Sequence, residues 1–242
     1  MARSSGKGSA ARTRARILWR IAAVLLLLAM AAGAWGWWYL RHWTPERAIY
    51  PVQGVEIGAA DGEVNWKSLK AVGVDFAYID ASASVSAFAR DPRFVANFVA
   101  AKAAGLQVGA VHRYDPCQPA DMQSGNFVTT VPRDAALLPP AIDLDILADG
   151  CPTNVSDAKV ESELMTFINQ IETHAGKPVI LKVSRAFEQR YRIAAKLDRN
   201  LWLVRDRLLP DYGGRPWSLW TANQSLSNEI AQGGLRWVVV QP

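Results

Sequence analysis

Two carboxylates, Asp143 and Asp145, stand two residues apart within the apolar run of residues 141–146. Residues i and i+2 of a β-strand project from the same face, so we expect both carboxylates side by side with apolar residues opposite. Burying acids is costly unless they are paired or functional, so this stretch predicts a site that uses them. Two like charges this close need a proton or a cation between them. A cation site completed by Asp149 is therefore the structural alternative.

The elements that must position these acids form a regular alternation from residue 53 onward. Strands are predicted at 54–58, 76–80, 107–112, 141–146, 179–183, 201–204, 218–221 and 236–240. Helices are predicted at 66–72, 93–104, 157–174 and 185–195. Strands that alternate with helices pair in parallel, and eight of them indicate an α/β fold closed into a (β/α) TIM-like barrel.

The later strands follow one another with less helix between them, so we expect this barrel to be irregular. A doubly wound open sheet is the alternative fold. No Gly-rich phosphate loop follows any of the strands, which removes the usual reason to prefer that fold.

Sites of α/β barrels lie at the C-terminal ends of the strands. Here those ends carry Glu56, Asp80, His112, Tyr114, Asp143, Asp145, Lys182, Asp206 and Trp220. Carboxylates for acid–base work beside aromatic faces for stacking on sugar rings are typical of a carbohydrate site. Each residue also has a structural alternative. The acids could pair with Lys182 or an arginine, and His112 and Trp220 could belong to the core.

The net charge of +5 is concentrated ahead of residue 21, where Lys and Arg occur without any acid. The rest of the chain is close to neutral, so this charge indicates a targeting signal and excludes a nucleic-acid footprint. Residues 21–40 carry no charge and are long enough to cross a bilayer as a helix. Basic residues on the N-terminal side alone keep that side cytoplasmic and export the remainder.

An aromatic belt follows at the far end of this apolar segment, formed by Trp35, Trp37, Trp38, Tyr39 and Trp43. It favours a retained anchor over a signal peptide cleaved near residues 32–34. We divide the chain into a disordered basic cytoplasmic tail (1–16), a transmembrane signal anchor (17–40), a linker (41–51) and a barrel (52–242).

An exported barrel places Cys117 and Cys151 in an oxidising compartment, where we predict that they form a disulfide; two free thiols are the alternative. There is no Cys-x-x-Cys pair and the three histidines are scattered. We therefore predict neither a metal nor a cofactor.

Several segments between residues 53 and 220 together suggest a family. Residues 54–57 (Gly-Val-Glu-Ile) and 62–66 match an opening Gly-Ile-Asp-Val strand and a Gly-x-Ile-Asp-Trp turn. Residues 104–112 match a third strand of the form Ala-Gly-Leu-x-x-Gly-x-Tyr-His, and 143–145 stand where an Asp-x-Glu is expected. In this order and spacing the sequence resembles the glycoside hydrolase family 25 lysozymes, the Chalaropsis-type muramidases.

This resemblance implies a flattened barrel that cleaves the β-1,4 bond between N-acetylmuramic acid and N-acetylglucosamine in peptidoglycan. Carried over, Asp145 is the acid/base, Asp143 orients the N-acetyl group of the substrate for assisted attack, and Glu56 lies across the site. Asp145 is one methylene shorter than the glutamate of the family, and Glu56 one longer than its aspartate. At residues 82–84 the chain has Ser-Ala-Ser where the family has Thr-Glu-Gly.

These observations leave three functional hypotheses. The first is a muramidase-like hydrolase anchored in a bacterial inner membrane, with its barrel in the periplasm and peptidoglycan as its substrate. The second is a glycan-binding barrel that has lost turnover. The third is a glycosidase that acts on another polysaccharide. Carboxylates at Glu56, Asp143 and Asp145 favour the first, and the change from Glu to Asp at 145 favours the second.

Overall fold

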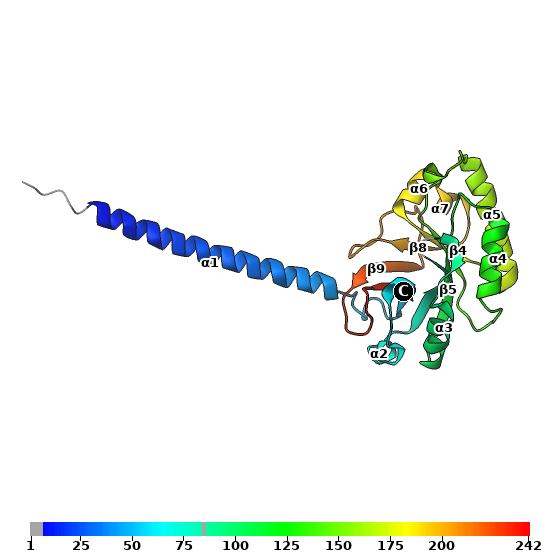
Figure 1. Cartoon of the computed structure of the whole chain (residues 1–242), viewed down its shortest axis with the longest axis horizontal. Helices are drawn as coiled ribbons and strands as arrows, with labels where there is room; N and C mark the ends of the chain where they lie inside the picture. Colours follow the sequence, from blue (N-terminus) through cyan, green and yellow to red (C-terminus); the bar gives the residue numbers. More distant parts are fainter. Residues whose placement is uncertain (1–6, 84–85) are drawn as a thin grey trace, which may run out of the picture. The chain divides into compact units, whose positions relative to one another are not determined.

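The computed structural model describes residues 7–83 and 86–242, and the side chains of residues 16–82 and 89–242. The chain divides into two compact units, Met1–His42 and Trp43–Pro242 (Figure 1). Ser84, the last residue of the Ser-Ala-Ser segment, lies outside the described residues.

The first unit contains a single long helix among its described residues, α1 (Lys7–His42). Its segment Arg16–His42 is long and apolar enough to cross a membrane, by length and composition. Residues 7–16, for which we predicted a disordered tail, belong to this helix, and residues 1–6 lie outside the described residues. Alanine and arginine are good helix formers, so this part of the chain extends the apolar helix.

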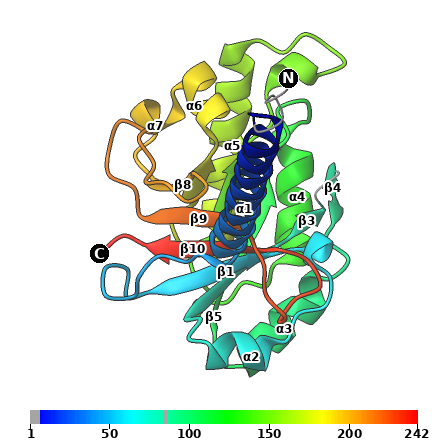
Figure 2. The same ribbon diagram turned by 90° about the vertical axis from the view of Figure 1, so that its left-hand side faces the viewer.

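The second unit is a barrel with helices around it (Figures 1 and 2). Its barrel strands are β1 (Gln53–Ile57), β2 (Phe76–Asp80), β5 (Gln107–Arg113), β6 (Ala141–Leu144), β7 (Ile180–Val183), β8 (Asn200–Val204), β9 (Leu219–Leu226) and β10 (Leu235–Val240). Its helices are α2 (Trp66–Ala71), α3 (Phe94–Ala103), α4 (Ala120–Thr130), α5 (Asp157–Ala175), α6 (Arg185–Tyr191) and α7 (Ile193–Lys196), with short 3-10 turns η1 (Ala59–Asp61) and η2 (Ala148–Gly150). A small hairpin, β3 (Ser82–Ala83) with β4 (Ser86–Arg90), follows β2.

The barrel closes in the order β1-β10-β9-β8-β7-β6-β5-β2, which confirms the predicted irregular α/β barrel. All neighbouring pairs are parallel except those of β10, which runs antiparallel to both β9 and β1. No helix separates β9 from β10, and a short connection between neighbouring strands makes them antiparallel. The irregularity is therefore concentrated in one strand, and that strand places Arg236 opposite Glu56.

The structure differs from the predicted helices and strands at several points, for local reasons. The helix predicted over 185–195 is broken into α6 and α7 at Arg192, whose φ of 52° lies in the left-handed region. Helix α4 was not predicted, because its buried face includes Gln123 and Ser124 beside Phe127. Strand β9 continues beyond residue 221 through a polar stretch in which Asn223 is fully buried.

The segment predicted as a linker packs against the barrel instead. The rings of Trp43 and Tyr50 lie 6.4 and 5.8 Å from that of Trp220. The Nδ2 of Asn223 donates to the carbonyl of Trp43 at 2.9 Å, and the Nε2 of Gln53 donates to carbonyls in the same segment. Buried polar partners and aromatic contacts fix this stretch, so the barrel unit begins at Trp43.

The predicted disulfide is confirmed: Cys117 and Cys151 are bonded, and their Cα atoms lie 5.2 Å apart. It joins the loop after β5 to the loop after β6, so it ties together the segments that follow two strands of the predicted site.

Removing this bond should lower stability without removing the fold. The bridge closes a loop with a sequence separation of 34, for which the chain-entropy relation gives about 3–4 kcal/mol. We expect the Cys117→Ser/Cys151→Ser variant to lose that free energy of unfolding in denaturant titrations followed by tryptophan fluorescence. Wild-type protein treated with reductant is the matched control and should show the same loss. Equal stability of the oxidised and reduced wild type would contradict the prediction.

Candidate active site

A cavity of ≈ 230 Å³ opens at the C-terminal ends of the parallel strands. It is lined by Glu56, Asp80, Ser82, Val111, Arg113, Asp143, Asp145, Lys182, Gln224 and Arg236. Five residues predicted for the site therefore meet in one cavity: the four acids and Lys182. The remaining bases, Arg113 and Arg236, were not predicted.

Alternation along the strands explains why charged groups gather at this level. A layer of buried apolar side chains fills the barrel below: Phe76, Tyr78, Val111, Ala141, Ile180, Trp202, Leu219 and Val238. The charged residues come two positions further along the same strands, so that Asp80 follows Tyr78 and Lys182 follows Ile180. The side-chain period of two in a strand thus stacks a polar layer directly on an apolar one.

Lys182 is a buried cation held between two acids. Its Nζ lies 2.6 Å from Glu56 Oε1 and 2.8 Å from Asp143 Oδ2, and its side chain is only 8% exposed. Burial alone would lower the pKa of Lys182, but the charges of Asp143 and Glu56 outweigh it and raise that pKa. The lysine therefore remains charged and links β1 to β6 through β7.

Arg236 contacts three carboxylates, Glu56 and two further ones. Its Nη2 donates to Asp80 Oδ2 at 2.9 Å and lies 3.4 Å from Asp61 Oδ2, while its Nε lies 3.4 Å from Glu56 Oε1. The antiparallel register of β10 pairs Arg236 directly with Glu56. Glu56 thus lies between two cations, Lys182 and Arg236.

Asp145 lies just beyond the end of β6 and has a different partner. Both of its oxygens accept from Arg113, at 2.8 Å from Nε and 2.7 Å from Nη2. A bidentate pair of this kind is strong and directional. The hydrogen bond to Asp145 is the main reason why the pKa of Arg113 is raised.

The acids of the cavity titrate differently because their surroundings differ. Burial raises the pKa of Asp80 to about 7, against the opposing charge of Arg236. Burial also raises the pKa of Asp143 to about 6, against the opposing charge of Lys182. Burial acts in the same direction on Glu56, but Lys182 and Arg236 together outweigh it and hold its pKa below the ordinary value. The cavity therefore combines a firmly ionised acid with two that can carry a proton near neutral pH.

Four residues predicted to bind substrate do not line this cavity: His112, Tyr114, Asp206 and Trp220. Val111 and Arg113 of β5 point inward, so His112 between them points outward, with its ring 5.0 Å from that of Phe167. Burial lowers the pKa of His112 to about 4, which keeps the imidazole neutral. The prediction placed the residue on the right strand end but on the wrong face.

Tyr114 and Trp220 are likewise core residues. The Tyr114 hydroxyl donates to the carbonyl of Val160 at 3.5 Å, and the Trp220 Nε1 donates to the carbonyl of Arg205 at 2.8 Å. Both are buried, so neither offers an aromatic face to the cavity. Asp206 supports the rim instead: it pairs with Arg207 and accepts from the backbone N–H of Gln224, which lines the cavity.

The alternative of a cation bound by Asp143, Asp145 and Asp149 has no support in the geometry. Each of the three faces its own base, and Asp149 lies 3.9 Å from Arg190 with its side chain 69% exposed. Among the residues that the structure describes, no group of three His, Cys, Asp or Glu side chains is arranged to hold a metal.

The positions of Arg113 and Arg236 in the sequence indicate that both arginines are partly buried. Arg236 is a lone charge in the otherwise apolar run of β10, and Arg113 follows the buried residues of β5. Such positions are as unusual as that of Asp143, because a buried charge needs a partner. An arginine at the end of a predicted apolar strand can therefore be predicted to pair with a buried acid of the site.

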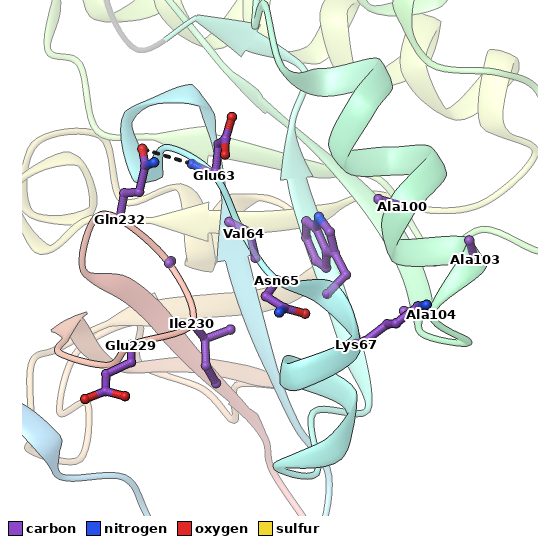
Figure 3. A pocket seen from close by; sticks show the side chains of 12 residues that line it. Glu63, Val64, Asn65, Lys67, Ala100, Ala103, Ala104, Glu229, Ile230 and Gln232 are labelled. Atoms are coloured by element: carbon purple, nitrogen blue, oxygen red, sulfur yellow. Dashed lines mark hydrogen bonds between the residues drawn. The ribbon is translucent and has the colours of Figure 1, made fainter.

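A second, wider groove of ≈ 650 Å³ lies on the outer surface between α2, α3 and the β9–β10 connection (Figure 3). Its walls are mainly short apolar side chains, including Ala100, Ala103 and Ile230. Glu63 stands at one end, where Gln232 Oε1 accepts from its backbone N–H at 3.4 Å. Glu63, Lys67 and Glu229 also line it, but among the described residues no ion pair joins these three to one another. The strand-end cavity, where buried acids and bases pair, is therefore the candidate active site.

Residues 55–233 match the model of the family described as glycosyl hydrolases family 25. The chain belongs to this family. The match covers the strands that carry Glu56, Asp80, Asp143 and Lys182. The family resemblance drawn from the short sequence motifs is thereby confirmed.

A lysozyme and a solved family 25 structure agree with this assignment. Lysozyme M1 of Streptomyces globisporus is 32% identical over 109 residues, which are 41% of this chain and 36% of that protein. YegX of Escherichia coli, an uncharacterised protein, is 22% identical over 180 residues, 72% of this chain and 63% of its own length. The chain thus spans less than two thirds of either curated relative. A family 25 glycosyl hydrolase structure from Bacillus anthracis superposes with a TM-score of 0.73 at 25% identity, covering 83% of this chain and 93% of that one.

Proposed function

We propose that this family 25 protein is a muramidase that hydrolyses the β-1,4 bond between N-acetylmuramic acid and N-acetylglucosamine in peptidoglycan. The observation that carries the proposal is the cavity in which four carboxylates meet at the strand ends. Burial and neighbouring charges separate the pKa values of three of them, Glu56, Asp80 and Asp143. The name of the Streptomyces lysozyme and the family of the Bacillus structure support the same chemistry.

The cavity suits hydrolysis assisted by the N-acetyl group of the substrate. As the bond between C1 and the leaving oxygen breaks, positive charge develops on the sugar ring, and the ionised Glu56 stabilises it. Asp143 accepts from the N–H of the acetamido group, so that the acetamido oxygen is turned toward C1. Lys182 keeps both of these carboxylates in place.

A glycan-binding barrel without turnover is the second candidate function. The observation that favours it is the pair between Asp145 and Arg113, because the family resemblance makes Asp145 the proton donor. The guanidinium engages both oxygens of this carboxylate, so neither oxygen is free to face the glycosidic oxygen of a substrate. Turnover then depends on another acid in the cavity.

The apolar segment of α1 is the basis for the location that we propose. Basic residues on its N-terminal side and the exposed aromatic residues Trp35, Trp37 and Trp38 support an anchor with its N-terminus in the cytoplasm. The barrel then lies in the periplasm beside the bacterial inner membrane, where peptidoglycan is within reach and a disulfide is stable.

The test is muropeptide release from purified peptidoglycan by the full chain in detergent. We expect soluble fragments that end in reducing N-acetylmuramic acid, as identified by borohydride reduction and mass spectrometry. Asp143→Asn removes one acid but keeps its shape, and it should slow release by about 100-fold or more. If the wild type binds peptidoglycan but does not cleave it, the function that remains is that of a glycan-binding barrel. Fragments that end in N-acetylglucosamine would exclude a muramidase.

A further inference from the structure

Asp80 is an acid of the cavity to which the family motifs assign no role. It ends β2, its side chain is 17% exposed, and its Oδ2 accepts from Arg236 at 2.9 Å. Gly58 lies against the same carboxyl, and a Cβ at that residue would overlap Asp80 Oδ2. The backbone of Gly58 donates to Asp61 Oδ2 at 2.7 Å, which fixes this glycine in place. The absence of a side chain at Gly58 therefore makes the room that the Asp80 carboxyl fills.

The two oxygens of Asp80 differ in their surroundings. Oδ2 has the guanidinium of Arg236, whereas Oδ1 has no hydrogen bond to any of the described residues. Oδ1 keeps some exposure to solvent, and Asp80 lines the cavity. Among the described residues, one oxygen of Asp80 thus has an anchor and the other has no hydrogen-bond partner.

Asp145 and Glu56 are held by more cation contacts than Asp80. Both oxygens of Asp145 are bound by Arg113, and Glu56 has Lys182 and Arg236 close to a single oxygen. Asp143 has the ammonium of Lys182 at 2.8 Å. Asp80 has Arg236 at 2.9 Å, and that guanidinium also lies 3.4 Å from Glu56 and from Asp61.

The charges that act on Asp80 come from four other strands around the barrel. Arg236 of β10 and Lys182 of β7 lower its pKa, whereas Glu56 of β1 and Asp143 of β6 raise it. Burial is the largest effect, and together these influences raise the pKa to about 7. A general acid is most effective when its pKa lies near the working pH.

We propose that Asp80 is the catalytic acid of this protein and donates its proton from Oδ1 to the glycosidic oxygen of peptidoglycan. The proposal rests on the function proposed above. The bond between C1 of N-acetylmuramic acid and the glycosidic oxygen breaks, its electron pair stays on that oxygen, and the proton from Asp80 completes the 4-hydroxyl of N-acetylglucosamine. The acetamido oxygen closes onto C1. Water then opens this ring at C1 and returns one proton to the Asp80 carboxylate.

The experiment compares Asp80→Asn with Asp145→Asn in the full chain on purified peptidoglycan, across pH 5 to 9. We expect the wild-type rate to fall as pH rises through about 7, because the donor loses its proton. Asp80→Asn should reduce the rate at pH 6 by about 100-fold or more and abolish that fall, while peptidoglycan still binds in a sedimentation assay. Asp145→Asn should keep the fall above pH 7, whatever its overall rate.

Three outcomes would overturn the assignment. The first is an Asp80→Asn variant with near wild-type rates, and the second is loss of the high-pH fall in Asp145→Asn alone. The third is equal loss in Asp80→Asn and Asp80→Glu, because a glutamate keeps the ionisable group and should restore part of the rate. A wild type that releases no muropeptides would instead overturn the proposed function itself, so the two failures are distinguishable.

Discussion

Replacing Lys182 with methionine should destabilise the barrel more than any other single substitution in the cavity. Methionine has a similar length and volume but no charge, so the apolar contacts of the stem are kept. The change leaves Glu56 and Asp143 buried without the ammonium that lies 2.6 and 2.8 Å from them. Removing one partner of a buried ion pair costs about 3–5 kcal/mol, because the remaining charge has lost its compensation.

The loss should depend on pH in a defined direction. Without Lys182 the pKa values of Glu56 and Asp143 rise, since burial already raises both and the lysine opposes that effect. A carboxyl whose pKa is higher in the folded than in the unfolded protein stabilises the fold below its unfolded pKa and loses that contribution as pH rises through its folded pKa. Lys182→Met should therefore be closest to the wild type near pH 5 and furthest from it near pH 8.

Denaturant unfolding at pH 5, 6.5 and 8 measures this dependence. Lys102→Met is the matched control, because Lys102 forms an exposed pair with Asp134 at 2.8 Å, with side chains 43% and 33% exposed. Exposed pairs contribute about 0–1 kcal/mol, so the control should stay near the wild type at every pH. A Lys182→Met variant as stable as Lys102→Met at pH 8 would show that the fold does not depend on the buried charge between Glu56 and Asp143.

The sequence allowed the architecture to be predicted because the barrel strands are short apolar runs separated by helices. Strand β2 was located at its observed bounds, and the approach of Lys182 to Asp143 follows from neighbouring strands that pair in parallel register. A parallel strand is buried on both faces and is therefore a continuous apolar run, which can be recognised in the sequence without knowledge of the fold.

What the sequence could not supply is the side of the strand on which a residue lies and the direction of a late strand. His112 and Arg113 are adjacent, and only the closed barrel decides that Arg113 enters the cavity while His112 packs on Phe167. Arg236 reaches Glu56 because β10 runs antiparallel, which brings a residue near the start of that strand to the C-terminal ends of the others. Both facts depend on long-range pairing and not on a local pattern.

Replacing Glu56 with glutamine should cost more activity than stability and should shift the titration of the remaining acids. The amide keeps the shape of the side chain but loses the negative charge that faces the developing positive charge of the sugar. Electrostatic stabilisation of this kind is worth about 100- to 1,000-fold in rate. Stability should change less than in Lys182→Met, because Lys182 retains Asp143 and Arg236 retains Asp80.

The titration shift follows from the charge of Glu56, which contributes to raising the pKa of both Asp80 and Asp143. With a neutral glutamine at residue 56, both pKa values should fall below about 7 and about 6, their respective values in the wild type. Titration of the carboxyl carbons by ¹³C NMR reads this directly and does not require residual activity. Where activity remains, the fall in rate at high pH should begin at a lower pH than in the wild type.

The matched control is Glu63→Gln, the same chemical change at a side chain that is 75% exposed and lies 3.9 Å from Arg93. It should leave both the muropeptide release rate and the Asp80 and Asp143 titrations unchanged, because solvent screens the charge of an exposed carboxylate. Unchanged titrations in Glu56→Gln would mean that burial alone holds the two aspartates protonated. The link between the acids across the barrel, through Lys182 on one side and Arg236 on the other, would then have no part in tuning them.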